Sequence, residues 1–147
     1  EEAFKKIFYK KSLFVSRGDN SGTHNKELSY WKKINLSPIP FSGKWYLETG
    51  TSMGATINTS IGLGAYTITD RASWLSFSNK FDHKVFVHGT KSLINPYSAI
   101  AINKNKCPMT KLEESQSVIR WLLSEKGKEK ITNFKKNGEQ LFFIKKK

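Results

Sequence analysis

The stretch FVSRGDNSGTHNKEL, residues 14–28, combines the residue types that bind small anions. Arg17 precedes the triplet Ser21-Gly22-Thr23 by four residues, and Asp19 lies between them. Arginine carries a permanent charge on a planar fork of donors, and serine and threonine add hydroxyl donors. An oxyanion that leaves water needs several fixed donors of this kind. The spacing therefore predicts an anion site, in which Asp19 either orients Arg17 or caps the turn.

The elements around this stretch are those that bring donors to one point. Residues 13–15 are an apolar run typical of a buried strand, residues 18–22 are turn formers, and a helical pattern extends from about Thr23 to Ile34. A helix N-terminus presents unpaired N–H groups and the positive end of the helix dipole. Strand, turn and helix thus predict that an anion binds at the helix start. The alternative is an ordinary N-cap beside a surface arginine.

The same order of elements recurs further along the chain. Thr51 or Ser52 is predicted to cap a second helix, and Asp70 is predicted to cap a third one after a short strand. Ligands of α/β sheets bind beyond the carboxyl ends of the strands. Ser52 and Gly54 on the second helix, and Arg71 on the third, are therefore further candidates. For Arg71 the alternative is a surface residue next to its cap.

The rest of the sequence indicates an α/β domain, because strands alternate with helices. Helices are expected at residues 3–11, from residue 112, and at the end of the chain to about Phe134. Ser124 and Gly127 are expected to separate the last two. Further strands are expected at residues 65–69, 85–87 and 97–102.

Composition limits the function classes. The chain has 147 residues and a formal net charge of +13, but its three arginines are outnumbered by lysines spread along the sequence. A nucleic-acid-binding protein is expected to cluster basic residues beside exposed aromatics. We therefore interpret the charge mainly as solvated surface, with a module that binds nucleic acid or another polyanion as the alternative. No apolar run approaches the roughly 18–20 residues of a membrane span, and the single cysteine, Cys107, excludes an internal disulfide.

Two features that resemble enzyme sites lack the residues that the chemistry requires. GDNSGT, residues 18–23, is faintly similar to the Gly-Asp-Ser-Gly-Gly motif of trypsin-like proteases, but Asn20 interrupts it and no buried carboxylate is marked to orient a catalytic base. His83 and His88 flank a predicted strand without the third nearby ligand that zinc requires. We therefore expect a protein that is not an enzyme and has no metal site.

Five motifs follow one another along the chain: FVSRGDNSGTHNKEL, WYLETGTSMGATI, GAYTITDRASW, LINPYSAIAIN and NGEQLFF. In this order they resemble the periplasmic tungstate-binding proteins of ABC importers, which are type II periplasmic solute-binding proteins. The resemblance implies a three-layer αβα lobe with a mixed sheet, and capture of a tetrahedral oxyanion, tungstate or molybdate, in a cleft between two lobes. It also implies an ABC transporter permease as the partner, no cofactor, and a periplasmic or extracellular membrane-anchored location. Because the Arg-x-x-x-Ser-Gly-Thr loop is also similar to that of phosphate-binding periplasmic proteins, a phosphate-type oxyanion is an alternative, as is the ligand-sensing domain of a regulator.

The resemblance also implies how the chain is divided. Residues 1–12 would be a connecting helix, residues 13–98 the second lobe, and residues 99–147 a return segment to the first lobe, whose N-terminal part, like a signal peptide, is not present in this chain. The candidate oxyanion-binding residues are Arg17, Ser21, Gly22, Thr23, Arg71, Ser16, Ser52 and Gly54, with Asp19 and Asp70 in supporting roles.

The C-terminal helix is expected to lack a partner. Its apolar residues Val118, Ile119, Leu122 and Leu123 would pack on the part of the first lobe that is not present here. Because large exposed apolar patches mark association surfaces, we expect the chain either to self-associate or to pack its C-terminal residues loosely. Oxyanion binding by the chain alone is expected to be weak.

Overall fold

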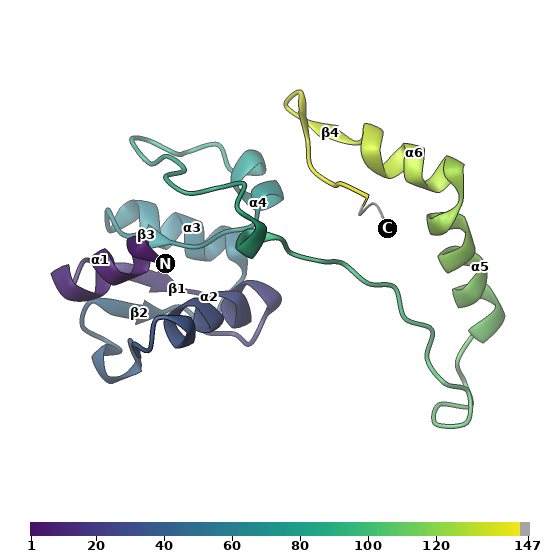
Figure 1. Ribbon diagram of the computed structural model, residues 1–147, viewed down its shortest axis with the longest axis horizontal. Helices are drawn as coiled ribbons and strands as arrows, with labels where there is room; N and C mark the ends of the chain where they lie inside the picture. Colours follow the sequence, from purple (N-terminus) through teal and green to yellow (C-terminus); the bar gives the residue numbers. More distant parts are fainter. Residues whose placement is uncertain (145–147) are drawn as a thin grey trace. The chain divides into compact units, whose positions relative to one another are not determined.

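The computed structural model describes residues 1–144, apart from the side chain of Lys91, and divides the chain into two compact units. Unit 1 is Glu1–Gly89 and unit 2 is Thr90–Lys147 (Figure 1). Short 3-10 helices occur in both, η1 (Ile39–Phe41) in unit 1 and η2 (Lys91–Leu93) in unit 2.

A three-stranded parallel sheet organises unit 1. Its strands are β1 (Phe14–Ser16), β2 (Tyr46–Glu48) and β3 (Tyr66–Thr67), in the order β2-β1-β3. Phe14 pairs with Tyr46 on one side and with Tyr66 on the other, so β1 is the central strand. All three residues of β1 are buried, as expected of a parallel strand covered on both faces. The predicted α/β class is confirmed, and the sheet in the described part of unit 1 is parallel throughout.

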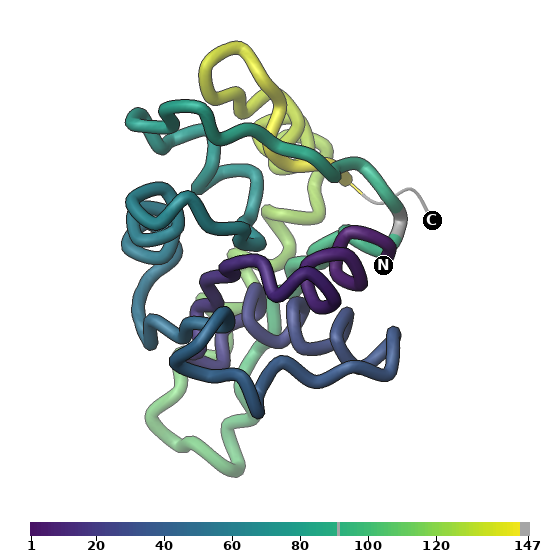
Figure 2. The backbone as a smooth tube through the Cα atoms, turned by 90° about the vertical axis from the view of Figure 1, so that its left-hand side faces the viewer, coloured from purple at the N-terminus to yellow at the C-terminus, as the bar shows by residue number. Residues whose placement is uncertain are grey.

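Helices pack on both faces of this sheet. They are α1 (Glu2–Lys10), α2 (Gly22–Lys33) and α3 (Met53–Gly62), and the short α4 (Arg71–Ser76) contacts α3. Phe14 lies against Phe4 of α1 and Trp31 of α2, with ring centroids 5.8 and 5.7 Å away. Neighbouring strand residues point to opposite faces, so Val15 points to the other face, where α3 contacts both β1 and β3. In Figure 2, α3 lies apart from α1 and α2.

Aromatic side chains make up most of the core between β1, α1 and α2. Phe14, Trp31 and Tyr46 are at most 1% exposed, and Trp45 is 6% exposed. Each large apolar side chain that is buried in this way stabilises the fold by about 1.5–3 kcal/mol. The helix predicted at residues 3–11 is confirmed as α1, and its Phe4 and Phe8 pack against this core.

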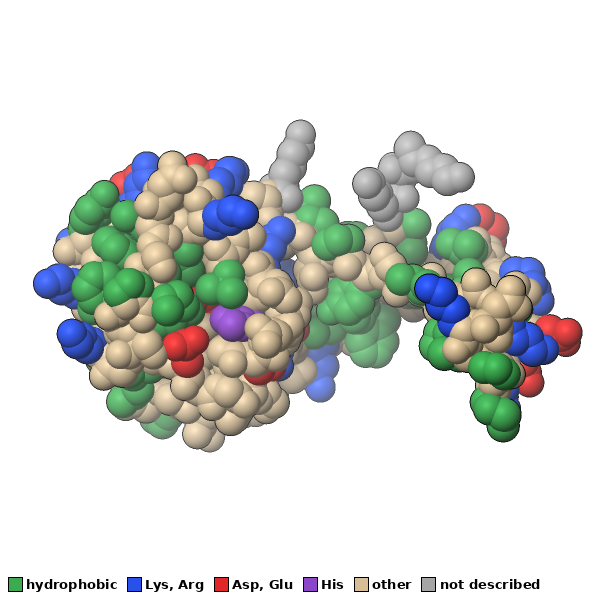
Figure 3. Space-filling model, turned by 90° about the horizontal axis from the view of Figure 1, so that it is seen from below, with side chains coloured by type: hydrophobic (Ala, Val, Ile, Leu, Met, Phe, Trp, Pro, Cys, Tyr) green, Lys and Arg blue, Asp and Glu red, His purple; other side chains and the backbone are tan. Residues whose placement is uncertain are grey.

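The basic residues of unit 1 are dispersed. On the face shown in Figure 3, lysine and arginine side chains are scattered among polar and apolar ones and do not gather in one patch. No helix in the described part of the chain is both long enough and apolar enough to cross a membrane.

Unit 2 contains two helices that meet at Ser124. α5 (Leu112–Leu123) ends there, and α6 (Glu125–Asn133) begins with the Ser124 hydroxyl accepting a hydrogen bond from the Gly127 N–H at 3.1 Å. The predicted break at Ser124 is confirmed, whereas the predicted break at Gly127 is wrong, because Gly127 lies within α6. A Cβ atom at Gly127 would lie 2.0 Å from the carbonyl oxygen of Trp121, so the close approach of the two backbones requires glycine here.

A β-hairpin follows that the sequence analysis missed. β4 (Lys135–Lys136) and β5 (Glu139–Gln140) pair antiparallel around Asn137-Gly138. Both loop residues have positive φ, 51° and 81°, as a type I′ turn requires. Asn-Gly is the dipeptide that favours this turn, so the sequence did contain the signal.

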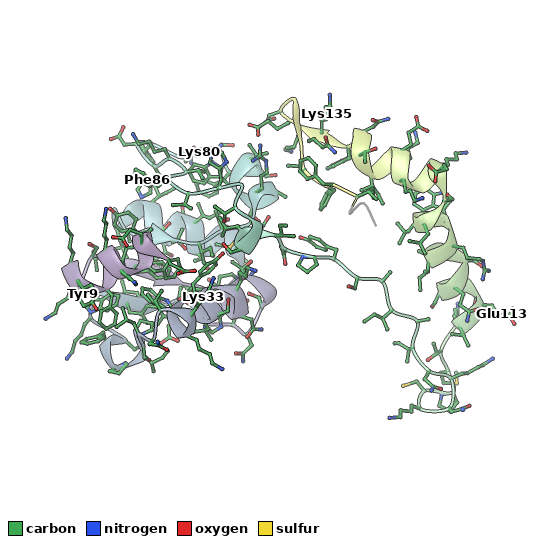
Figure 4. The ribbon with its side chains drawn as sticks, viewed as in Figure 1. Tyr9, Lys33, Lys80, Phe86, Glu113 and Lys135 are labelled. Carbon is green, nitrogen blue, oxygen red and sulfur yellow. The ribbon has the colours of Figure 1, made fainter. Side chains whose placement is uncertain are left out.

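The strands predicted at residues 85–87 and 97–102 are wrong, because both segments are irregular. A strand must pair its backbone groups with a neighbour, and neither segment joins a sheet within residues 1–144. Phe86, labelled in Figure 4, instead places its ring 6.3 Å from that of Tyr66 on β3. Ile100 is 83% exposed.

The apolar residues of α5 are not covered by the described rest of unit 2. No residue of α5 is buried among the described parts of the chain. Val118, Trp121 and Leu123 are 58%, 47% and 67% exposed. Loose packing of this region and self-association both stay predictions.

Candidate functional site

Three helix N-termini lie at one edge of the unit 1 sheet. α2 follows the carboxyl end of β1, α3 follows that of β2, and α4 follows that of β3. Since the three strands are parallel, these carboxyl ends lie at the same edge. The N-cap residues are Ser21, Ser52 and Asp70. The predicted cap at Asp70 is confirmed, and Ser52 takes the predicted N-cap position but makes no capping hydrogen bond with its side chain. Each helix start brings unpaired N–H groups to this edge.

The loop between β1 and α2, residues 17–21, is held by an ion pair. Arg17 Nη2 donates to Asp19 Oδ2, and the other carboxylate oxygen, Oδ1, accepts from the Ser21 N–H at 3.1 Å. Hydrogen bonds from Ser21, supported by Arg17, lower the pKa of Asp19 below its ordinary value despite partial desolvation. Asp19 therefore both orients Arg17 and caps the turn, which are the two roles that the sequence left open.

The backbone of this β1–α2 loop passes twice through the left-handed region. Gly18 has φ 62° and Asn20 has φ 58°. A Cβ atom at Gly18 would lie 2.9 Å from Cβ of Glu48 at the end of β2, so only glycine fits without displacement. At Gly18 the loop therefore packs closely against the end of the neighbouring strand, β2.

The first turn of α2 leaves donors available. The Ser21 hydroxyl accepts from the His24 N–H at 3.3 Å, and the Ser21 side chain also helps to lower the pKa of Asp19 by hydrogen bonding to it. Gly22 and Thr23, the first two residues of α2, have N–H groups without an acceptor within the described chain, as expected of a helix start. Arg17 Nε is buried and likewise has no partner there.

The loop after β2 is fastened to the β1–α2 loop by Thr49. Its hydroxyl lies 3.3 Å from the carbonyl oxygens of both Ser16 and Arg17, and 3.0 Å from the Thr56 hydroxyl on α3. The Thr49 N–H also donates to the Ser16 carbonyl at 3.0 Å. These bonds fix the start of α3 relative to the β1–α2 loop.

The other candidate residues divide between this edge and the interior. Ser52 and Gly54 are exposed at the start of α3. Asp70 accepts from the N–H and the hydroxyl of Ser73, at 2.8 and 2.7 Å, and Arg71 is exposed at the first position of α4. Ser16 is completely buried in β1 instead.

A buried carboxylate below the loop was missed by the sequence analysis. Glu27 on α2 is 0% exposed, and its Oε1 accepts from Trp31 Nε1 at 3.0 Å and from the Tyr46 hydroxyl at 2.8 Å. Burial raises the pKa of Glu27, while these two donors and the nearby Ser16 hydroxyl oppose the rise. Ser16 Oγ is buried and makes no hydrogen bond of ordinary geometry within the described chain. Burial and the charge of Glu27 raise the pKa of Tyr46, so its hydroxyl keeps the proton that it donates.

The spacing of these residues gave a partial signal. His24, Glu27 and Trp31 are three and four residues apart, so they share one face of α2. That face turns out to be buried, which places a carboxylate beside the indole N–H of Trp31. Within residues 1–144, no three His, Cys, Asp or Glu side chains lie close enough together to hold a metal ion.

Named proteins resemble this chain over nearly its whole length. It is 35% identical over 142 residues to the tungstate-binding protein TupA of Peptoclostridium acidaminophilum, an alignment that covers 95% of this chain and 49% of that protein. Another tungstate-binding protein TupA, from Campylobacter jejuni, is 34% identical over 148 residues, which are 98% of this chain and 54% of that protein. The chain thus spans about half the length of these curated relatives.

Solved structures give the same result. The tungstate-binding protein TupA from Desulfovibrio alaskensis G20 superimposes with a TM-score of 0.75 at 40% identity, covering 95% of this chain and 57% of that one. The tungstate ABC transporter structure from Geobacter sulfurreducens gives a TM-score of 0.77 at 36% identity, covering 90% and 55%. The family model described as the PBP superfamily domain matches residues 1–126, and the chain therefore belongs to the PBP superfamily.

Proposed function

We propose that this chain is part of the substrate-binding component of an ABC importer that captures a tetrahedral oxyanion, tungstate or molybdate. The observation that carries the proposal is the β1–α2 loop, which joins the Arg17–Asp19 ion pair to a helix start where the N–H groups of Gly22 and Thr23 have no acceptor within the described chain. The names of the relatives, which are tungstate-binding proteins, support the choice of anion.

The chain supplies one wall of the site. Arg17 offsets the negative charge, and the Ser21 hydroxyl with the N–H groups of Gly22 and Thr23 donates to the anion oxygens. The starts of α3 and α4, with Ser52, Gly54 and Arg71, approach the anion from the other side of the same edge. Because Ser16 is buried, it would act indirectly, by helping to position the β1–α2 loop.

The relation to a second lobe and to a transporter belongs to the same proposal. Residues 13–98 would form the second lobe, residues 99–147 would return to the first lobe, and residues 1–12 would be a connecting helix. The protein would act outside the cytoplasmic membrane, in the periplasm or anchored to the membrane, and would deliver the anion to a permease. It would need no cofactor and would not act as an enzyme.

Titration calorimetry of the full-length protein with tungstate, molybdate, sulfate and phosphate tests the proposal. We expect tungstate or molybdate to bind with a Kd in the micromolar range or below. Arg17→Gln should weaken that binding by about 3 kcal/mol, roughly a hundredfold in Kd, because a desolvated dianion loses its countercharge. Arg120→Gln is the matched control, since Arg120 lies on α5 and donates to Ser117; it should leave the affinity unchanged. An Arg17→Gln affinity within threefold of wild type would contradict the assignment. Binding of long polyanions that falls steeply with salt would favour the polyanion-binding alternative.

A further inference from the structure

The β1–α2 loop contains a histidine whose acceptor nitrogen is already in use. His24 is the third residue of α2 and is 6% exposed. Its Nδ1 lies 3.0 Å from the backbone nitrogen of Asn20, which donates to it. A nitrogen that accepts from an N–H carries no proton, so the neutral ring must hold its proton on Nε2.

This bond acts on the left-handed residue that precedes Ser21. Asn20 has φ 58°, a conformation that asparagine adopts more readily than most non-glycine residues. The Asn20 N–H is fixed by His24, and the Asn20 carbonyl accepts from the Asn25 side chain at 2.9 Å. Both sides of the left-handed residue are therefore held by the first turns of α2.

The pattern of N–H groups shows what this accomplishes. Three N–H groups of the loop and first turn have acceptors inside the protein: Asn20 bonds to His24, Ser21 to Asp19, and His24 to Ser21. The two between them, those of Gly22 and Thr23, have none within the described chain. The internal acceptors thus decide which donors remain for a ligand.

We propose that His24 is a positioning residue of the oxyanion site: through Nδ1 it holds the Asn20 peptide in place, so that the N–H groups of Gly22 and Thr23 are presented together with Arg17. The inference rests on the proposed function and adds a residue that does not itself touch the anion. The competing view is that His24 only fills space on the buried face of α2 that also carries Glu27.

Two substitutions distinguish the loss of the hydrogen-bond acceptor at His24 from a change in side-chain volume. His24→Leu keeps a similar volume and removes the acceptor, whereas His24→Asn loses volume but places its Oδ1 near the position of Nδ1. In the full-length protein we expect His24→Leu to weaken tungstate binding about tenfold, the effect of one lost ordering hydrogen bond. His24→Asn should restore most of the affinity even though its smaller side chain lowers the stability. If His24→Leu binds like wild type, or if His24→Asn loses as much as His24→Leu, the inference is overturned.

A measurement without ligand keeps the inference separate from the proposed function. Nitrogen-15 NMR of the histidine rings should show His24 with its proton on Nε2, and the Asn20 amide should exchange with solvent faster in His24→Leu than in wild type. A proton on Nδ1 in wild type would refute the role of His24, and this result can be obtained even if His24→Leu does not fold. If His24→Leu folds, an unchanged exchange rate of the Asn20 amide would also refute it. If wild type binds no tungstate while both NMR results are as expected, the proposed function fails and the positioning of the loop by His24 stands.

Discussion

Gly18→Ala tests how tightly the β1–α2 loop is pressed against β2. Two costs add at this position. The left-handed φ of 62° disfavours alanine by about 1–2 kcal/mol. The new Cβ would lie 2.9 Å from Cβ and 3.5 Å from Cα of Glu48, and relief of such a contact costs about 1–3 kcal/mol. We therefore expect a loss of about 3 kcal/mol in the free energy of unfolding.

The assay is urea unfolding followed by tryptophan fluorescence, because Trp31 and Trp45 are buried in unit 1. Gly54→Ala is the matched control: Gly54 lies in the first turn of α3, its φ is ordinary, and no atom outside its own helical turns lies within 4 Å of the place that the new methyl group would take. That substitution should be neutral or should stabilise by about 0.4–1 kcal/mol, since alanine reduces the freedom of the unfolded chain.

The two glycines together make the reasoning refutable. If Gly18→Ala unfolds within about 0.5 kcal/mol of wild type, a spread typical of surface substitutions, the loop is free to move away from Glu48. Arg17 and Asp19 would then not be held by the strand end, and the geometry of the candidate site would lose its support.

Three further outcomes are expected. Burial raises the pKa of Glu27, so the folded protein keeps the carboxyl proton at pH values where the unfolded chain has lost it. Wild type should therefore lose stability relative to Glu27→Gln as the pH rises from 4.5 through the raised pKa, and urea unfolding at a series of pH values measures this loss. Tyr46→Phe removes the 2.8 Å bond to Glu27 and should cost about 1.5–3 kcal/mol at neutral pH, and less in acid where the carboxyl is protonated; an equal cost at both would contradict the charge-assisted bond. Gly127→Ala forces a methyl against the Trp121 backbone and should destabilise the α5–α6 junction by about 3 kcal/mol, seen as lost far-UV circular dichroism at lower urea; unchanged unfolding would refute the close approach.

Local patterns were sufficient to predict several turns and helix starts of unit 1. The turn formers between Val15 and Thr23, and the cap at Asp70, act within a few residues of themselves, so the sequence places them correctly. The strands expected at residues 85–87 and 97–102 failed for the opposite reason. An apolar run forms a strand only where another strand is available to pair with it, and the run itself does not contain that information.

In the candidate site, too, contacts between residues close in sequence were predictable and contacts between distant residues were not. The contact of Arg17 with Asp19 spans two residues and follows from their order in the loop. The bond between Glu27 and Tyr46 spans 19 residues and depends on the register that sets Tyr46 beside Phe14. No local rule supplies that register. For His24 the position on α2 was visible in the sequence, but its role as an acceptor depends on the left-handed turn at Asn20.

The candidate site does not share the large positive net charge of the whole chain. The net charge of +13 comes from dispersed lysines, yet at the carboxyl edge of the sheet Arg17 and Arg71 are accompanied by three carboxylates, Asp19, Glu48 and Asp70. These five side chains therefore provide no excess of positive charge with which to hold an anion. Under the proposed function it is held by N–H groups at fixed positions and by one arginine that Asp19 orients. Donors of fixed direction recognise the shape and proton content of a single anion, whereas mobile lysines attract any polyanion. A strongly basic chain can in this way be selective for one small oxyanion, because the groups that select it are not the groups that give the chain its charge.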